Sequence, residues 1–237
     1  MLGALRIAAP KAQFLRTYSR DVVLLLPDEA LSQHDVLPLG EVVRGRLGED
    51  PGQLLDDPRY DRVTALSRRE LPLQHERLQV LLTDFDDLDR RRDMLGADDV
   101  FCALGTTMAR AGSRSAFEQV DHGMVLALAQ AARRAGARQF VLVSAAGSSA
   151  TSPSFYSRTK ARVESDLRAL GYPGLHILRP SLLLGDRRES RPMEQLAQRL
   201  SPALGWLARG PMARYAPVQA ATVATAMRVI GSSWRRS

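Results

Sequence analysis

From Tyr60 onward, short runs of apolar and β-branched residues alternate with longer stretches of helical periodicity. Five runs are short enough to be strands and are bounded by polar or turn-forming residues. They are Arg62–Leu66, Leu78–Leu82, Asp99–Ala103, Gln139–Ser144 and Leu175–Arg179. Strands that alternate with helices are typical of βα units around a parallel sheet. The pattern predicts one doubly wound α/β domain with a Rossmann-like parallel sheet.

Two long amphipathic patterns predict crossover helices. The first covers Phe117–Ala135 and closes at Gly136, a residue that suits a helix C-terminus. The second covers Phe155–Leu170, closes at Gly171 and is barred from extension by Pro173. The apolar stripe expected on the first helix is Val120, Met124, Leu128 and Ala131.

The first fifth of the chain is harder to interpret. Val22–Leu26 is a candidate first strand, but the stretch between Pro27 and Pro58 has scattered glycines and no period. We therefore divide the chain into residues 1–51, an irregular or atypical first βα unit, and residues 52–237, the Rossmann-like domain. From Pro192 a short C-terminal region is expected to form a substrate lid. The first twenty residues are basic and lack acids, which leaves a transit peptide and an unstructured or mis-started N-terminus both open.

Composition and charge narrow the function classes. Apolar residues make up 45% and charged residues 25% of the chain, and no apolar run reaches the ~20 residues of a membrane span. The net charge of +7 raises nucleic-acid binding as an alternative, but basic and acidic residues are interleaved, which favours a solvated surface. We expect no nucleic-acid or membrane partner. The single Cys102 excludes an internal disulfide and favours a reducing, cytoplasmic location, and the isolated histidines favour no metal.

The clearest candidate for chemistry is the set Ser144, Tyr156 and Lys160. Ser144 ends a predicted strand, where open α/β sheets bind their ligands, and Tyr156 and Lys160 share one face of the next helix. A nearby ammonium favours the phenolate form of tyrosine, so Lys160 would lower the pKa of Tyr156. Tyr156 could then exchange a proton with a substrate oxygen that Ser144 holds. A Tyr-x-x-x-Lys pair also arises by chance on exposed helices, and that alternative stays open on the pair alone.

Six ordered blocks of sequence resemble the atypical short-chain dehydrogenase/reductases, most closely the Tat-interacting oxidoreductase group and its bacterial relatives. The resemblance runs from about Gly52 to Ile230. The blocks are Val63–Arg69, Thr83–Asp87, Phe101–Thr107, Phe140–Ser144, Phe155–Lys160 and Leu178–Arg187, the last continuing into Glu189–Pro192. The resemblance implies an NAD(P)-binding Rossmann fold, shared with epimerases and dehydratases, and Ser144, Tyr156 and Lys160 as catalytic residues.

The resemblance also implies a cofactor site. Arg68 and Arg69 follow the second strand, where two guanidiniums suit the 2′-phosphate of NADP (NADPH), although a solvated arginine loop is the alternative. The resemblance further implies that Asp84 and Phe85 flank the adenine and that the cofactor approaches the protein backbone closely at Leu104, Gly105 and Thr106. Pro180 and Leu183 are implied at the nicotinamide, and Arg191 at the cofactor phosphates.

One family feature is missing. Proteins of this group carry Gly-x-x-Gly-x-x-Gly directly after the first strand, so that the pyrophosphate sits on a helix N-terminus. Here Leu26-Pro-Asp-Glu-Ala30 follows the candidate strand, and Gly45-Arg-Leu-Gly48 has only one correct interval. Three explanations stay open: a shifted or mis-joined reading frame before Gly52, a loss of dinucleotide binding, or a longer loop that binds phosphate differently. We expect that residues 22–52 form no phosphate cradle.

Together these observations predict an NADP-dependent oxidoreductase acting on a small carbonyl or alcohol substrate. The alternative is a catalytically weak or inactive homologue of the same fold that senses cofactor or acts as a scaffold. The sequence leaves open whether the chain is a monomer or a homodimer.

Overall fold

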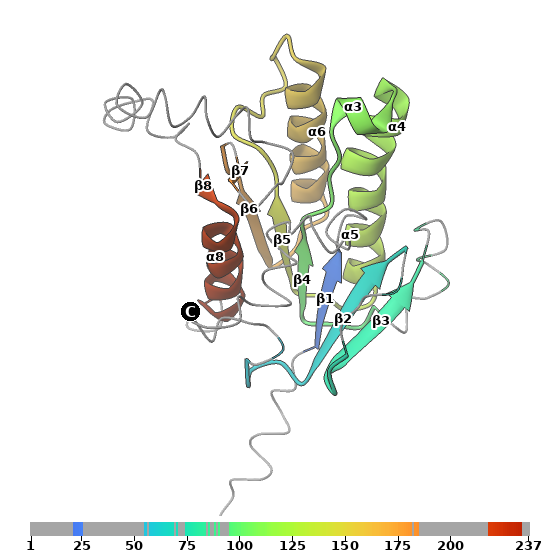
Figure 1. Ribbon diagram of the computed structural model, residues 1–237, viewed down its shortest axis with the longest axis vertical. Coiled ribbons are helices and arrows are strands. Elements are labelled where there is room, and N and C mark those ends of the chain that lie inside the picture. The colour runs from blue at the N-terminus through green and yellow to red at the C-terminus, as the bar shows by residue number, and fades with distance from the viewer. Residues whose placement is uncertain are drawn as a thin grey trace, which may run out of the picture.

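A computed structural model describes residues 21–25, 55, 57–68, 70, 74–83, 85, 88, 90, 95–181, 183–184 and 218–233. Within these residues, six parallel strands form one sheet in the order β3-β2-β1-β4-β5-β6 (Figure 1). The strands are β1 (Asp21–Leu25), β2 (Arg62–Ser67), β3 (Leu78–Leu82), β4 (Asp99–Cys102), β5 (Gln139–Val143) and β6 (Gly174–Leu178). This order is that of a doubly wound dinucleotide-binding fold, and it confirms the predicted fold class.

The strand β1 occupies the centre of the sheet. Val22 pairs with Val63 of β2 on one side, and Leu25 pairs with Cys102 of β4 on the other. The predicted strand Val22–Leu26 is therefore confirmed to within a residue. Because the chain runs from β1 to β3 in one direction and from β4 to β6 in the other, the switch point of the sheet lies between β1 and β4.

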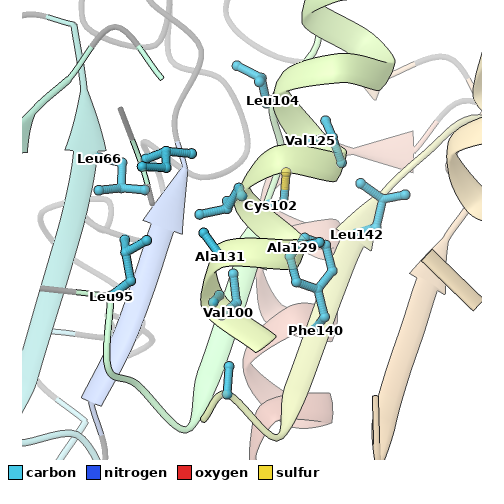
Figure 2. Close-up of a cluster of buried hydrophobic side chains, with 14 of the residues drawn as sticks. Leu66, Leu95, Val100, Cys102, Leu104, Val125, Ala129, Ala131, Phe140 and Leu142 are labelled. Carbon is cyan, nitrogen blue, oxygen red and sulfur yellow. The ribbon is translucent and has the colours of Figure 1, made fainter. Parts of the chain in front are cut away.

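Helices cover both faces of the sheet. Figure 2 shows α5 (Val125–Arg134) on one side of β4 and β5 and α8 (Ala220–Ser233) on the other. The remaining elements are α3 (Met108–Ala111), α4 (Arg114–Glu118), η3 (Gln119–Met124), α6 (Phe155–Ala169) and a small sheet of β7 (Leu183–Leu184) with β8 (Val218–Gln219).

The predicted helix over Phe117–Ala135 is interrupted. Residues Gln119–Met124 form a π-helical segment between α4 and α5. A π-helical turn contains more residues than an α-helical turn, so the phase of the buried face shifts across it. The side chains of Asp121 and His122 are consequently both buried, whereas Val120 and Met124 of the predicted stripe are only partly buried.

Alternate residues of β4 face different layers of the core. Val100 and Cys102 belong to the cluster beneath α5 together with Val125, Phe140 and Leu142 (Figure 2). Phe101 points to the other layer, where its ring meets that of Tyr60 edge-on at 6.5 Å between centroids. Cys102 is a buried core residue, and this burial raises the pKa of its thiol to about 12.

Several sequence-based predictions lie outside the described residues. They concern the cofactor residues Arg69, Asp84 and Arg191, the part of the predicted lid between residues 192 and 217, and most of the segment between Val22 and Gly52. The described part of the region predicted as a lid, residues 218–233, forms β8 and α8. Among the helices that the structure describes, none is both long and apolar enough to cross a membrane.

A glycine on α8 gives a test of the packing against the sheet. A Cβ atom at Gly231 would lie 2.7 Å from both Phe101 Cζ and Tyr60 Oη, whereas one at Gly123 would meet only Glu118 O at 3.9 Å. We expect Gly231→Ala to lower the free energy of unfolding by about 1–3 kcal/mol, as overpacking does. Gly123→Ala, the control, should be neutral or stabilising by up to about 1 kcal/mol. Urea denaturation measures both, and equal stabilities of the two variants would contradict the packing described.

Candidate functional site

The residues proposed from the sequence gather at the carboxyl edge of the sheet. Because all six strands are parallel, the segments that follow β2, β3, β4, β5 and β6 meet at the same edge. These segments contain, in that order, Arg68, Phe85, the turn Leu104–Thr106, Ser144 and Pro180. Ligands of open α/β sheets bind at this edge, beside the switch point.

A buried ion pair lies beneath the turn after β4. The Lys160 ammonium on α6 is 2.7 Å from Asp121 Oδ1 on η3, and the two side chains are 6% and 0% exposed. The second oxygen, Oδ2, accepts a hydrogen bond from the backbone N–H of Thr106 at 2.8 Å. Asp121 thus contacts the ammonium through one oxygen and accepts the amide hydrogen bond through the other. Burial raises the pKa of this carboxyl above its ordinary value, and Lys160 and the Thr106 amide act in the opposite direction.

Gly105 lies directly over this pair. A Cβ atom at this position would lie 3.2 Å from Asp121 Oδ1 and 3.4 Å from Lys160 Nζ. The first distance is tight enough that Asp121 would have to shift by a few tenths of an ångström, whereas the second is at the limit of ordinary contact. The absence of a side chain at residue 105 thus lets the backbone approach the ion pair without displacing Asp121.

Tyr156 begins the same face of α6, one turn before Lys160. Its ring packs against Phe117 of α4, with 5.6 Å between the ring centroids. Burial raises the pKa of the phenol; Lys160 lowers it, and Asp121 raises it again. The net direction is upward, because burial is the largest contribution and, with the Asp121 charge, outweighs the lowering by Lys160. Lys160 does act in the direction expected from the sequence, but the lowered pKa expected for Tyr156 is wrong for this structure.

Ser144 belongs to a second buried network, built around Glu164 of α6. Its Oγ donates a hydrogen bond to Glu164 Oε1 at 2.6 Å and lies 3.4 Å from Ser148 Oγ. Glu164 is fully buried and also accepts hydrogen bonds from Arg179 Nε, at 2.9 and 3.1 Å to its two oxygens. Among the hydrogen bonds that the structure gives for the described residues, none joins the Ser144 and Tyr156 hydroxyls. The structure thus brings Tyr156 and Lys160 together and turns the Ser144 hydroxyl toward Glu164.

The residues expected on the adenosine side are spread along the edge. Arg68 is exposed after β2. Phe85, after β3, is buried and has a left-handed backbone with φ of +72°, and its N–H donates to Thr83 Oγ1 at 3.0 Å. A bulky residue in this region is strained, which singles out the segment after β3.

The residues expected near the nicotinamide are also placed in part. Leu104 is part of the hydrophobic core. The Pro180 carbonyl accepts a hydrogen bond from Ala146 N–H at 2.8 Å, which ties the segment after β6 to the segment after β5. Leu183 lies in β7, opposite Val218.

Two buried carboxylates of the site, Asp121 and Glu164, were not predicted from the sequence. Asp121 follows Phe117 and precedes Val125 by four residues each, so it lies on the buried stripe of its helix, and an acid at such a position is a readable signal. Glu164 follows Lys160 by four residues on α6, which places it on the face that carries Tyr156 and Lys160.

The Glu164 network makes a prediction about acid stability. Burial raises the pKa of Glu164, but hydrogen bonds from Arg179 and Ser144 outweigh it, so its pKa lies below the ordinary value of 4.5. A lowered pKa stabilises the fold above pH 4.5, and that contribution is lost as the pH falls further. We expect Glu164→Gln to cost about 1–3 kcal/mol at neutral pH, less than a fully buried pair because Arg179 is half-exposed.

The stability difference between wild type and Glu164→Gln should shrink in acid, because protonation of Glu164 removes its stabilising contribution from wild type there as well. Glu118→Gln, which removes an exposed pair with Arg162, is the control and should change stability by less than about 0.5 kcal/mol. Urea denaturation between pH 3 and pH 7, in steps of about one unit, measures the difference. A stability cost for Glu164→Gln that does not change with pH would contradict this assignment.

Sequence comparisons agree with the fold. The sequence profile of the NAD(P)H-binding family matches residues 45–198. "Protein fmp52, mitochondrial" of Aspergillus clavatus is 41% identical over 148 residues, which cover 60% of this chain and 63% of that protein. "Protein HTATIP2" of Rattus norvegicus is 36% identical over 169 residues, which cover 70% of this chain and 68% of that protein. The resemblance to the Tat-interacting group is thereby confirmed.

Solved structures share the fold at low sequence identity. The Bordetella bronchiseptica enzyme WbmH in complex with NAD+ has a TM-score of 0.60 and 16% identity, covering 90% of this chain and 73% of that chain. The UDP-N-acetylglucosamine 4-epimerase of Methanobrevibacter ruminantium also has a TM-score of 0.60, with 17% identity over 91% of this chain and 74% of that chain.

The comparison also corrects one expectation and fixes the family. A cytoplasmic location, expected from the single cysteine, is wrong on this evidence, because the Aspergillus relatives are named as mitochondrial proteins. A single free cysteine fits any reducing environment, and a reducing environment does not specify a compartment. With the sheet order, the edge site and the family profile all in agreement, the chain belongs to the NAD(P)H-binding family of Rossmann-fold proteins.

Proposed function

We propose that this chain is an NADP-dependent oxidoreductase that acts on a small carbonyl or alcohol through Ser144, Tyr156 and Lys160. The observation that carries the proposal is the turn of α6 with Tyr156 and Lys160, which lies at the carboxyl edge beside the switch point, with the Lys160 ammonium buried beneath Gly105. An unexposed lysine is uncommon, and here it lies where a dinucleotide fold binds its ligand.

The residues at this edge fit a nicotinamide dinucleotide. Residue 105, after β4, is a glycine, so a ligand can come close to the backbone there. Arg68 carries an exposed guanidinium at the end of β2. We propose that Arg68 and Arg69 hold the 2′-phosphate and that Asp84 and Phe85 flank the adenine. The cofactor would pass close to the backbone of Leu104, Gly105 and Thr106, with Pro180 and Leu183 against the nicotinamide and Arg191 at the phosphates. The nicotinamide would supply or accept the hydride.

Each protein group has a defined task in this proposal. Tyr156 Oη gives a proton to the substrate oxygen in reduction and takes it back in oxidation. The Lys160 ammonium favours the phenolate electrostatically. Ser144 Oγ holds the substrate oxygen by donating its single proton. To do so it must release the hydrogen bond to Glu164, which keeps its bonds from Arg179.

A second candidate function rests on that same hydrogen bond. The Ser144 hydroxyl donates to Glu164, and burial raises the pKa of Tyr156, so neither group is set for proton transfer as it stands. The sequence after β1 also lacks the glycine-rich turn. A homologue that senses cofactor or acts as a scaffold would have these features. The matched part of the Aspergillus clavatus protein is 63% of its length, so the activity of the whole relative is likewise only a proposal for this chain.

The substrate is proposed only by class. The solved structure of MoeE5, with a TM-score of 0.57 and 17% identity, is described as a complex with UDP-glucose and NAD. This likeness supports a small-molecule substrate together with a dinucleotide and leaves the preference for NADP over NAD to the arginines after β2.

Replacement of Tyr156 tests the catalytic assignment. Tyr156→Phe should lower the turnover number of any reductase activity at least about 100-fold, because the phenol takes part in proton transfer. The dissociation constant of NADPH should stay within about threefold, because the hydroxyl adds little to ground-state binding. Tyr172→Phe is the control, since its hydroxyl donates to Ala129 O in the core. Steady-state kinetics over a panel of carbonyls decides, and wild-type turnover by Tyr156→Phe would sink the assignment.

Replacement of the arginine pair tests the cofactor preference. Arg68→Ala together with Arg69→Ala should weaken NADPH binding about ten- to a hundred-fold and NADH binding much less, because only NADPH carries the 2′-phosphate. Arg134→Ala together with Arg138→Ala removes the same charge near the amino edge of the sheet and is the control. Fluorescence titration measures both cofactors. Equal losses of NADPH and NADH would show that the pair is surface charge.

A further inference from the structure

We propose that Asp121 is the positioning residue of this site, because one of its carboxylate oxygens holds the Lys160 ammonium and the other holds the Thr106 amide. The turn after β4 and the catalytic helix α6 are thereby set as one unit. The role of Lys160 and Thr106 in this statement rests on the proposed function, whereas the link between them is a property of the ligand-free protein.

The geometry requires Asp121 to do more than fill space. Its side chain has no exposure, so its charge must be compensated from within the protein. Lys160 supplies the opposite charge at 2.7 Å, and Thr106 supplies a backbone donor at 2.8 Å. An apolar residue at position 121 could pack as well, but it could not bind two donors from two different elements. Gly105 completes the arrangement, because any Cβ there would press on the ion pair.

The π-helical segment fastens these elements together at two points. Its irregular turn buries the neighbours Asp121 and His122 at the same time. Asp121 contacts Lys160, and His122 Nε2 lies 2.6 Å from Asp166 Oδ2, also on α6. Two neighbouring side chains of the π-helical segment therefore contact α6, at Lys160 and at Asp166, and these two contacts hold η3 against α6.

The pair also sets the charge seen by Tyr156. Lys160 and Asp121 are the ionised groups that act on the phenol, with opposite effects on its pKa. The facing helix α4 contributes the neutral Phe117, and Cys102 at the end of β4 stays a neutral thiol because burial raises its pKa to about 12. Loss of the Asp121 charge would leave the Lys160 charge uncompensated beside Tyr156.

Two variants of the ligand-free protein separate the two links. Asp121→Asn keeps an oxygen that can accept from Thr106 N–H but removes the charge that holds Lys160, whereas Asp121→Ala removes both links. Hydrogen exchange reports the Thr106 amide. Acylation reports Lys160, because the only other lysine, Lys11, can be replaced by arginine in all proteins compared. Glu118→Gln, three residues away and in an exposed pair, is the control.

In Asp121→Asn we expect acylation of Lys160 to be faster by about tenfold or more, because the amine is no longer held in its buried contact with the Asp121 carboxylate and becomes more accessible to the reagent. Exchange of the Thr106 amide should stay within about threefold of wild type. In Asp121→Ala, exchange of that amide should also be faster by about tenfold, the value of one lost hydrogen bond. Acylation and exchange in both variants equal to those in Glu118→Gln would overturn the proposal.

An unfolded single variant would still be informative. Asp121→Asn and Asp121→Ala can each be combined with Lys160→Met, which removes the ammonium that would otherwise be buried without a partner. If Asp121→Asn unfolds and the double variant folds, Lys160 depends on Asp121 as proposed. The two double variants differ only in the acceptor for Thr106 N–H, so equal exchange at Thr106 in both would overturn the link to the turn.

A kinetic readout distinguishes this inference from the proposed function. If wild type shows no turnover with NADPH, the proposed function fails, and the exchange and acylation results still decide on Asp121. If it turns over, Asp121→Asn should move the rising limb of alcohol oxidation to lower pH by about half a unit or more, because Tyr156 acts as the base and its pKa falls. A rate lowered equally at every pH would show a merely structural role and overturn the positioning role.

Discussion

A carboxylate without solvent contact has to be neutralised by the protein around it, and the arrangement of this site depends on that constraint at Asp121. The compensation comes from Lys160 on α6 and from the backbone of Thr106 after β4. A Cβ atom at residue 105 would lie 3.2 Å from Asp121 Oδ1, so a glycine lets the backbone come this close without displacing the carboxylate. A π-helical turn, which is a costly local irregularity, delivers the carboxylate to this position.

One face of α6 organises both buried networks. This face carries three side chains at intervals of four residues, Tyr156, Lys160 and Glu164, and each has different partners. Lys160 is held from one side by Asp121, and Glu164 is held from the other by Ser144 and Arg179. α6 is thus held by two ion pairs, Lys160 with Asp121 and Glu164 with Arg179. The proposed function requires Ser144 to exchange its hydrogen bond to Glu164 for one to the substrate, and Lys160 to act on Tyr156 while Asp121 holds it.

The sequence predicted the fold better than the site. The six strands of the main sheet were predicted to within a residue, β1 included, because short β-branched runs bounded by polar residues need no tertiary information, whereas the two-residue strands β7 and β8 were not predicted. The π turn within Phe117–Ala135 was missed, because hydrophobic periodicity assumes one residue spacing throughout. Asp121 and Glu164 were missed for a related reason: a buried carboxylate is recognised by its partners, and Lys160, Thr106 and Arg179 come close to these acids only in the folded chain.

The central claim is that this edge of the sheet binds a nicotinamide dinucleotide, although the sequence after β1 lacks the glycine-rich turn. The most direct test is a titration of the purified wild-type chain with NADPH and with NADH, followed by nicotinamide fluorescence. This account predicts saturable binding of NADPH, tighter than that of NADH because of the arginines after β2. Saturation by neither cofactor would contradict the claim and leave the Rossmann sheet as a scaffold without its ligand.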